Sequence, residues 1–145
     1  MARIMGLDVG TKTIGVAVSD GLEMLAHPVC TLSRRGVKKD VEMLLPLMGE
    51  HDVSTLIVGL PLELDGTEER SARLARQIGA EARARTGVPV YYVDERFTSV
   101  DAERQLIEVH MRREQRKAVI DQQAAVLILQ SFLDGRDGAI HDQEK

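Results

Sequence analysis

The chain has 145 residues, 43% of them hydrophobic and 29% charged, which is the composition of a soluble globular protein with room for one domain. Its net charge of -4 and aromatic content of 3% argue against a surface that attracts nucleic acid as a whole, and against a base-stacking platform. No apolar run approaches the roughly 20 residues that span a bilayer. We therefore expect no membrane partner, and we expect no signal peptide because the amino terminus has the pattern of a strand. Because Cys30 has no second cysteine to pair with, we expect a reducing, cytoplasmic setting.

The first predicted element is an antiparallel hairpin. Residues 4–10 and 13–18 are apolar runs, and the segment Gly10-Thr11-Lys12, from the end of the first run to the start of the second, suits a short turn. Alternation along the first strand places Asp8 on the same face as Gly6. Because a buried carboxylate is costly, Asp8 either binds a ligand or accepts turn amides at the strand's end. This segment alone favours neither interpretation.

Three further elements are expected in the first half of the chain. Residues 26–32 have the pattern of a third strand. From Val37 to Met48 the apolar residues follow a helical period, within which Pro46 should kink the helix or confine it to fewer turns. The continuously apolar run 55–59 is typical of a central parallel strand buried on both faces.

The second half of the chain alternates helices and strands. Thr67 is a candidate cap for a helix that runs to about Arg85. Residues 88–93 follow as a strand, and the capping-box pattern at 98–101 predicts another helix. A last helix is expected from near Ile120 to Leu133.

This order of elements predicts an α/β fold with one mixed sheet covered by helices. We expect a single domain over residues 1–135. The polar segment 136–145 is expected to be a flexible C-terminal tail.

Three acidic residues occupy comparable places in this arrangement. Asp8 ends the first strand, Glu95 follows the last strand, and Asp121 begins the last helix. Ligands of α/β sheets bind at such strand ends, and carboxylates brought together there repel one another unless a cation is present. Mg²⁺ or Mn²⁺ suits carboxylate oxygens, and two such ions can promote phosphodiester cleavage. Asp94 and Asp101 are reserve ligands, since turn and capping roles suit them better.

Asp121 shares a helical stripe with Ala125, Ile128 and Phe132, which places its carboxylate on the face toward the sheet. A solvated surface aspartate would not be there. The alternative is that Asp121 is the N-cap of the helix, worth about 1 kcal/mol.

Four motifs, in order and spanning nearly the whole chain, resemble the YqgF family of bacterial RNase H-like nucleases, also described as Holliday junction resolvases. They are Gly6–Lys12 continuing to Gly15–Ala17, Val58–Pro61 with Asp65–Thr67, Asp94–Ser99, and Ile120–Asp121 followed by Ala124–Gln130.

The resemblance implies a ribonuclease H-like fold, with a five-stranded mixed sheet whose first three strands are antiparallel and whose remaining strands are parallel. It implies that Asp8, Glu95 and Asp121 are the catalytic acids and the ligands of Mg²⁺ or Mn²⁺. It also implies processing of the 5′ end of pre-16S ribosomal RNA. The chain departs from RuvC-type resolvases at Gly59-Leu60-Pro61, where they have an acid at the end of the fourth strand. Glu95 must then substitute from the neighbouring strand.

Two basic segments are candidate contacts for phosphate groups. Arg112, Arg113, Arg116 and Lys117 precede Asp121, and we predict that they bind nucleic acid; a solvated helix end is an equal alternative. A second cluster over residues 34–39 carries less weight, since charge runs are usually solvated faces.

The leading hypothesis is a metal-dependent endonuclease acting on structured RNA, with branched DNA such as a four-way junction as the rival substrate. A non-catalytic, RNA-binding ribosome-assembly factor is a second class. A third is ATP binding, because residues 8–12 also resemble the first phosphate loop of the actin and sugar-kinase fold, although that fold needs two such domains. The sequence leaves monomer and homodimer open.

Overall fold

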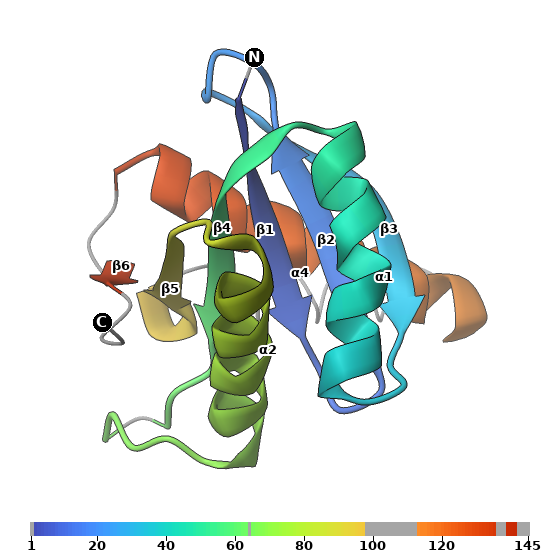
Figure 1. Ribbon diagram of the computed structural model, residues 1–145. Helices are drawn as coiled ribbons and strands as arrows, with labels where there is room; N and C mark the ends of the chain where they lie inside the picture. Colours follow the sequence, from blue (N-terminus) through green and yellow to red (C-terminus); the bar gives the residue numbers. More distant parts are fainter. Residues whose placement is uncertain (1, 64, 98–112, 136–138, 142–145) are drawn as a thin grey trace.

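A computed structural model describes residues 2–63, 65–97, 113–135 and 139–141, with the backbone alone at 97, 113–119 and 139–141. Figure 1 shows its helices and strands in sequence colours. In chain order they are β1 Arg3–Val9, β2 Thr13–Ser19, β3 Ala26–Ser33, α1 Val37–Glu50, β4 Val53–Leu60, α2 Arg70–Thr86, β5 Val90–Asp94, the 3-10 turn η1 Glu95–Phe97, α4 Arg113–Leu133 and β6 Ala139–His141.

The strands form one mixed sheet in the order β3-β2-β1-β4-β5-β6. β1, β2 and β3 are antiparallel neighbours, while β1, β4 and β5 run parallel. This confirms the α/β fold, the opening hairpin and the predicted sequence of antiparallel and then parallel strands. Near the carboxyl ends of β1 and β4, Asp8 lies opposite Gly15 of β2, and Gly59 lies opposite Val93 of β5.

A sixth strand lies where the sequence predicted a flexible tail. Residues Ala139–His141, within the segment 136–145, pair antiparallel with Tyr91–Val93 of β5. The sheet therefore has one strand more than the five predicted. A three-residue strand is too short for alternation to reveal it, and its pairing depends on the free edge of β5.

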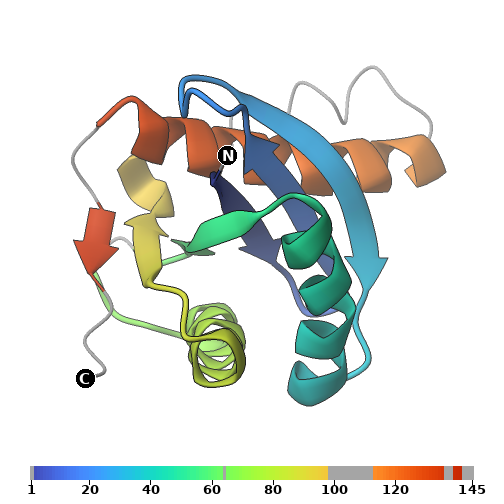
Figure 2. The same cartoon turned by 45° about the horizontal axis from the view of Figure 1, so that its top comes forward.

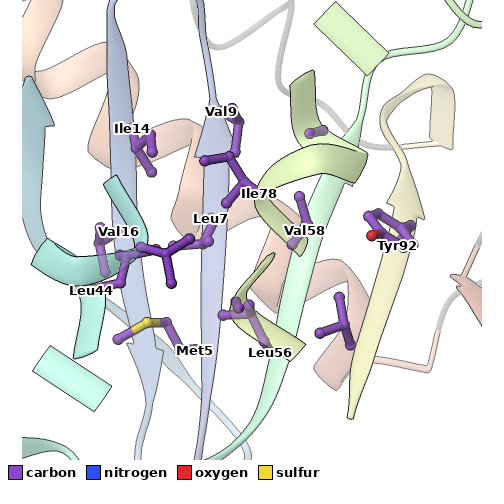
Figure 3. Close-up of a cluster of buried hydrophobic side chains, with 14 of the residues drawn as sticks. Met5, Leu7, Val9, Ile14, Val16, Leu44, Leu56, Val58, Ile78 and Tyr92 are labelled. Atoms are coloured by element: carbon purple, nitrogen blue, oxygen red, sulfur yellow. The ribbon is translucent and has the colours of Figure 1, made fainter. Parts of the chain in front are cut away.

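Helices cover the sheet on both sides, as Figure 2 shows: α4 crosses one face, and α1 and α2 lie on the other. The alternation of β1 supplies both layers. Met5, Leu7 and Val9 face α1 and α2, in the core cluster that Figure 3 shows. Ile4 packs with the apolar side of α4. Among the described residues, no helix combines the length and the apolarity that crossing a membrane requires.

The last helix begins earlier than predicted, at Arg113 rather than near Ile120. Asp121 is therefore inside α4, and the N-cap alternative for it is wrong. The polar residues before Ile120 hid the start of the helix, because they interrupt the apolar period without breaking the backbone.

The predicted cap at Thr67 is also wrong, because α2 begins at Arg70. The side chain of Asp65 accepts hydrogen bonds from the backbone N–H and the hydroxyl of Thr67, at 2.9 and 2.7 Å. These bonds hold the pKa of Asp65 below its ordinary value. The backbone N–H and the hydroxyl of Thr67 are thus engaged in this local turn and do not cap a helix.

Helix α1 runs through Pro46 to Glu50, so the proline does not shorten it. The helix predicted to start at Thr98, with the reserve ligand Asp101, lies outside the described residues.

A buried ion pair joins the start of α1 to the β1–β2 turn. The Arg34 Nε–H donates to Asp40 Oδ2 at 2.7 Å, and the two side chains are only 9% and 0% exposed. Asp40 Oδ1 also accepts from the Arg35 backbone N–H at 2.7 Å. In the other direction, Arg34 donates through Nη1 to the Gly10 carbonyl and through its backbone N–H to the Lys12 carbonyl. The turn after Asp8 is therefore fixed to the helix layer.

We predict that Asp40→Ala lowers the free energy of unfolding by about 3–5 kcal/mol, because it leaves the guanidinium of Arg34 buried without its partner. Urea denaturation measures this. Glu50→Ala, at the exposed other end of α1, is the control and should change stability by less than about 0.5 kcal/mol. Equal stability of the two variants would contradict the assigned role of the pair.

Candidate functional site

An open pocket of about 250 Å³ lies at the edge of the sheet where the parallel strands β1, β4 and β5 end. The residues that line it come from segments that are far apart in the chain. The three acids predicted from the sequence all line it. The complete lining is Asp8, Val9, Gly10, Pro61, Ser71, Glu95 and Asp121.

Asp8 is the most enclosed of the three acids, with a residue exposure of 6%. It lies near the end of β1 and on the face that α4 covers. Its position there follows from strand alternation, because its neighbours Leu7 and Val9 occupy the opposite core. A buried carboxylate at a pocket wall is costly unless polar groups or a cation stabilise it.

Asp121 reaches the pocket from the inner face of α4. The Thr13 hydroxyl, at the start of β2, donates to Asp121 Oδ2 at 2.6 Å. Next to it, a side chain at Gly15 would overlap the backbone carbonyl of Asp121, so glycine lets the helix rest directly on the strand. Since Gly15 lies opposite Asp8, this contact brings Asp121 beside the end of β1.

Glu95 enters the pocket from the residue after β5, across the end of β4. A Cβ built on Gly59 would stand 2.9 Å from Glu95 Oε2. This carboxylate and the side chain of Ile128, whose Cδ1 atom would stand even closer to that Cβ, therefore share the space that a side chain on β4 would fill. This shows how an acid can reach the pocket when position 59 itself carries none. The motif Gly59-Leu60-Pro61 held this signal, although a glycine in a strand can equally mark a bulge or a tight bend.

The reserve ligand Asp94 has a different role. It is 3% exposed and pairs with Arg96, whose Nη2 lies 2.6 Å from Asp94 Oδ2. The hydrogen bonds to this carboxylate raise the pKa of the Arg96 guanidinium. Arg96 also donates to the carbonyl of Glu63, so the pair ties η1 to the loop before α2. Asp94 does not line the pocket.

Sequence reasoning missed two lining residues, Pro61 and Ser71. Pro61 follows β4, and Ser71 lies in the first turn of α2. A serine in a first helical turn is too common to signal a site. It adds a residue with a neutral hydroxyl group to the lining of the pocket.

The donors that line the pocket are carboxylate and hydroxyl oxygens, the hard ligands that Mg²⁺ and Mn²⁺ take. The residues present thus fit such an ion in chemical type. In the described part of the chain, no group of three or more His, Cys, Asp or Glu side chains is arranged closely enough to hold a metal. The pocket gathers the acids without closing them into a preformed cage.

The predicted basic segment is only partly described. Arg112 lies outside the described residues, while Arg113, Arg116 and Lys117 belong to the first turns of α4. They therefore belong to the same helix as Asp121. Their contact with nucleic acid stays a prediction.

A family model described as RuvX, Holliday junction resolvase, matches residues 2–135. The chain belongs to this family. This confirms the resemblance inferred from the motifs. A protein of Moorella thermoacetica named "Putative pre-16S rRNA nuclease" is 45% identical over 138 residues, covering 94% of this chain and 99% of its own length. One with the same name from Myxococcus xanthus is 46% identical over 132 residues, covering 91% of this chain and 87% of its own.

Solved structures agree on the fold. RuvC of T. thermophilus, in complex with a Holliday junction substrate, superposes with a TM-score of 0.59 at 15% identity, covering 97% of this chain and 99% of its own. The resolvase of Fowlpox virus, also in complex with junction DNA, gives 0.52 at 12% identity, covering 92% and 97%. At these identities the likeness establishes the RuvC-like RNase H fold alone.

We predict that Thr13→Val lowers the free energy of unfolding by about 1.5 kcal/mol, because the Asp121 carboxylate loses a short hydrogen bond from a hydroxyl. Thr13→Ser keeps the hydroxyl and should retain most of the stability. Chemical denaturation at neutral pH compares the two. A serine variant as unstable as the valine variant would show that the methyl group, and not the hydrogen bond, matters.

Proposed function

We propose that this protein is a metal-dependent endonuclease that cleaves phosphodiester bonds in structured nucleic acid, and that its substrate is the 5′ end of pre-16S ribosomal RNA. The observation that carries the proposal is the convergence of Asp8, Glu95 and Asp121, from three separate elements, on one pocket. Family membership and the names of the relatives support the nuclease class.

The three acids would hold Mg²⁺ or Mn²⁺, which when bound activates water and offsets charge on the phosphate and the leaving oxygen. Each acid is positioned by a different part of the fold. Asp8 is fixed by β1, Asp121 by the hydroxyl of Thr13, and Glu95 by the space above Gly59. The site is open to solvent, so a large polymer can approach it.

Holliday junction cleavage is the second candidate. It is favoured by the description of the family and by the junction complexes of the two structural neighbours. A pocket at the edge of a sheet does not by itself distinguish RNA from branched DNA. The two substrates must therefore be compared in one assay.

We predict that Asp8→Asn reduces cleavage by more than roughly 100-fold with either Mg²⁺ or Mn²⁺, since even residues that only support metal ligands cost 10–100-fold. The assay offers an RNA with the 5′ leader of pre-16S ribosomal RNA and a DNA four-way junction side by side. Asp134→Asn, an exposed position at the end of α4, is the matched control and should cleave normally.

Equal cleavage by Asp8→Asn and the unchanged protein would remove Asp8 from the mechanism. Preference for the junction would favour the resolvase. If neither substrate is cut and Asp8→Asn still supports cell growth, the non-catalytic assembly factor becomes the better account.

The role of Glu95 can be tested through Gly59. We expect Gly59→Ala to displace the Glu95 carboxylate and to reduce cleavage, but the new methyl group would also press on Ile128 of α4. In an Ile128→Val background that contact is relieved and the pressure on Glu95 remains. We therefore expect the double variant to regain most of the stability that overpacking costs, about 1–3 kcal/mol, without regaining activity. Recovery of both would show that Glu95 is not needed in its present position.

A further inference from the structure

Four cationic side chains gather beside the pocket: Lys12, Arg35, Lys38 and Lys39, here named the turn–helix cation cluster. Lys12 lies in the β1–β2 turn, and the other three lie at the start of α1 or just before it. The hydrogen bond from the Arg34 backbone N–H to the Lys12 carbonyl joins the two segments. Figure 1 shows the turn, the end of β3 and the start of α1 side by side at the lower edge of the molecule.

All four residues of the cluster are exposed, and none forms an ion pair with a described residue. Other arginines behave differently. Arg76 pairs with Glu68, and Arg96 pairs with Asp94. A chain with a net charge of -4 thus keeps four unneutralised positive charges together at one place.

Arg34 belongs to this segment of the sequence but not to the exposed cluster. It is buried against Asp40, so its charge is neutralised. Its guanidinium also donates to the carbonyl of Gly10 at 3.2 Å, and Gly10 lines the acidic pocket. The buried pair therefore connects the cluster rigidly to the pocket. A solvated charged face would need no such connection.

We propose that the turn–helix cation cluster binds the phosphate backbone of the nucleic acid whose scissile bond lies in the acidic pocket. The inference rests on the proposed function and extends it by naming a surface for the substrate. Three carboxylates repel a polyanion, and cations next to them offset that repulsion. Phosphate contacts of this kind position the substrate without reading its sequence.

The experiment measures binding rather than cleavage. A fluorescent RNA hairpin is titrated with the protein in the presence of a chelator, and anisotropy gives the dissociation constant between about 50 and 200 mM salt. Each cation that contacts a phosphate contributes about one unit to the slope of log K against log salt. We expect Lys12→Gln and Lys39→Gln each to weaken binding and to reduce that slope by about one unit.

Arg3→Gln is the matched control, because it removes one charge at the start of β1. The pocket and the cluster lie at the other end of this strand. Arg3→Gln should leave the slope unchanged, as should the charge-preserving Lys12→Arg and Lys39→Arg. Unchanged slopes in both glutamine variants, or an equal loss in Arg3→Gln, would overturn the proposal. Because cleavage is assayed separately, an inactive protein whose binding still depends on Lys12 and Lys39 would refute the nuclease and retain the cluster.

Discussion

Helix α4 packs on the β1–β2 ribbon through two glycines, and the position of Asp121 beside Asp8 depends on this contact. A Cβ on Gly6 would stand 2.7 Å from the Cβ of Leu129, and one on Gly15 would overlap the carbonyl of Asp121. Without side chains at these positions, the helix lies on the backbone of the sheet. The short distance lets the Thr13 hydroxyl bond to the Asp121 carboxylate and brings that carboxylate to the end of β1. A bulkier residue at position 15 would move Asp121 away from Asp8.

The features that the sequence predicted correctly are those that follow a regular period along a strand or a helix. Alternation in β1 identified the face of Asp8, and the helical stripe that includes Ile128 identified the inward face of Asp121. What it missed depends on single local interactions. Asp65 accepts hydrogen bonds from the amide and the hydroxyl of Thr67, and α2 therefore begins later in the chain than predicted. The strand β6 exists through pairing with an edge that is distant in the chain. Period and composition carry no information on either.

Glu95 lies between these two cases. Its place after β5 was predictable, but its reach was not, because that depends on an empty volume above another strand. Gly59 lies opposite Val93 in the sheet, so Glu95 begins one step beyond the end of β4. Position 59 carries no acid in this chain, but the absence of a side chain there leaves space for the carboxylate of Glu95. An acidic pocket can thus be built from neighbouring strands, because the sheet edge, and not the individual strand, defines the site.

The electrostatics of the chain lead from the pocket to the surface around it. Concentrating carboxylates suits a divalent cation but opposes the approach of a nucleic acid, and the net charge of -4 adds to this opposition. Positive charge must therefore be local, and it must be held where the polymer passes. Arg34 meets this requirement indirectly: paired with Asp40, it adds no charge of its own, yet it fixes the turn that carries Lys12 to the helix that carries Lys39. A neutral, buried pair supplies the rigidity, and the exposed lysines supply the charge.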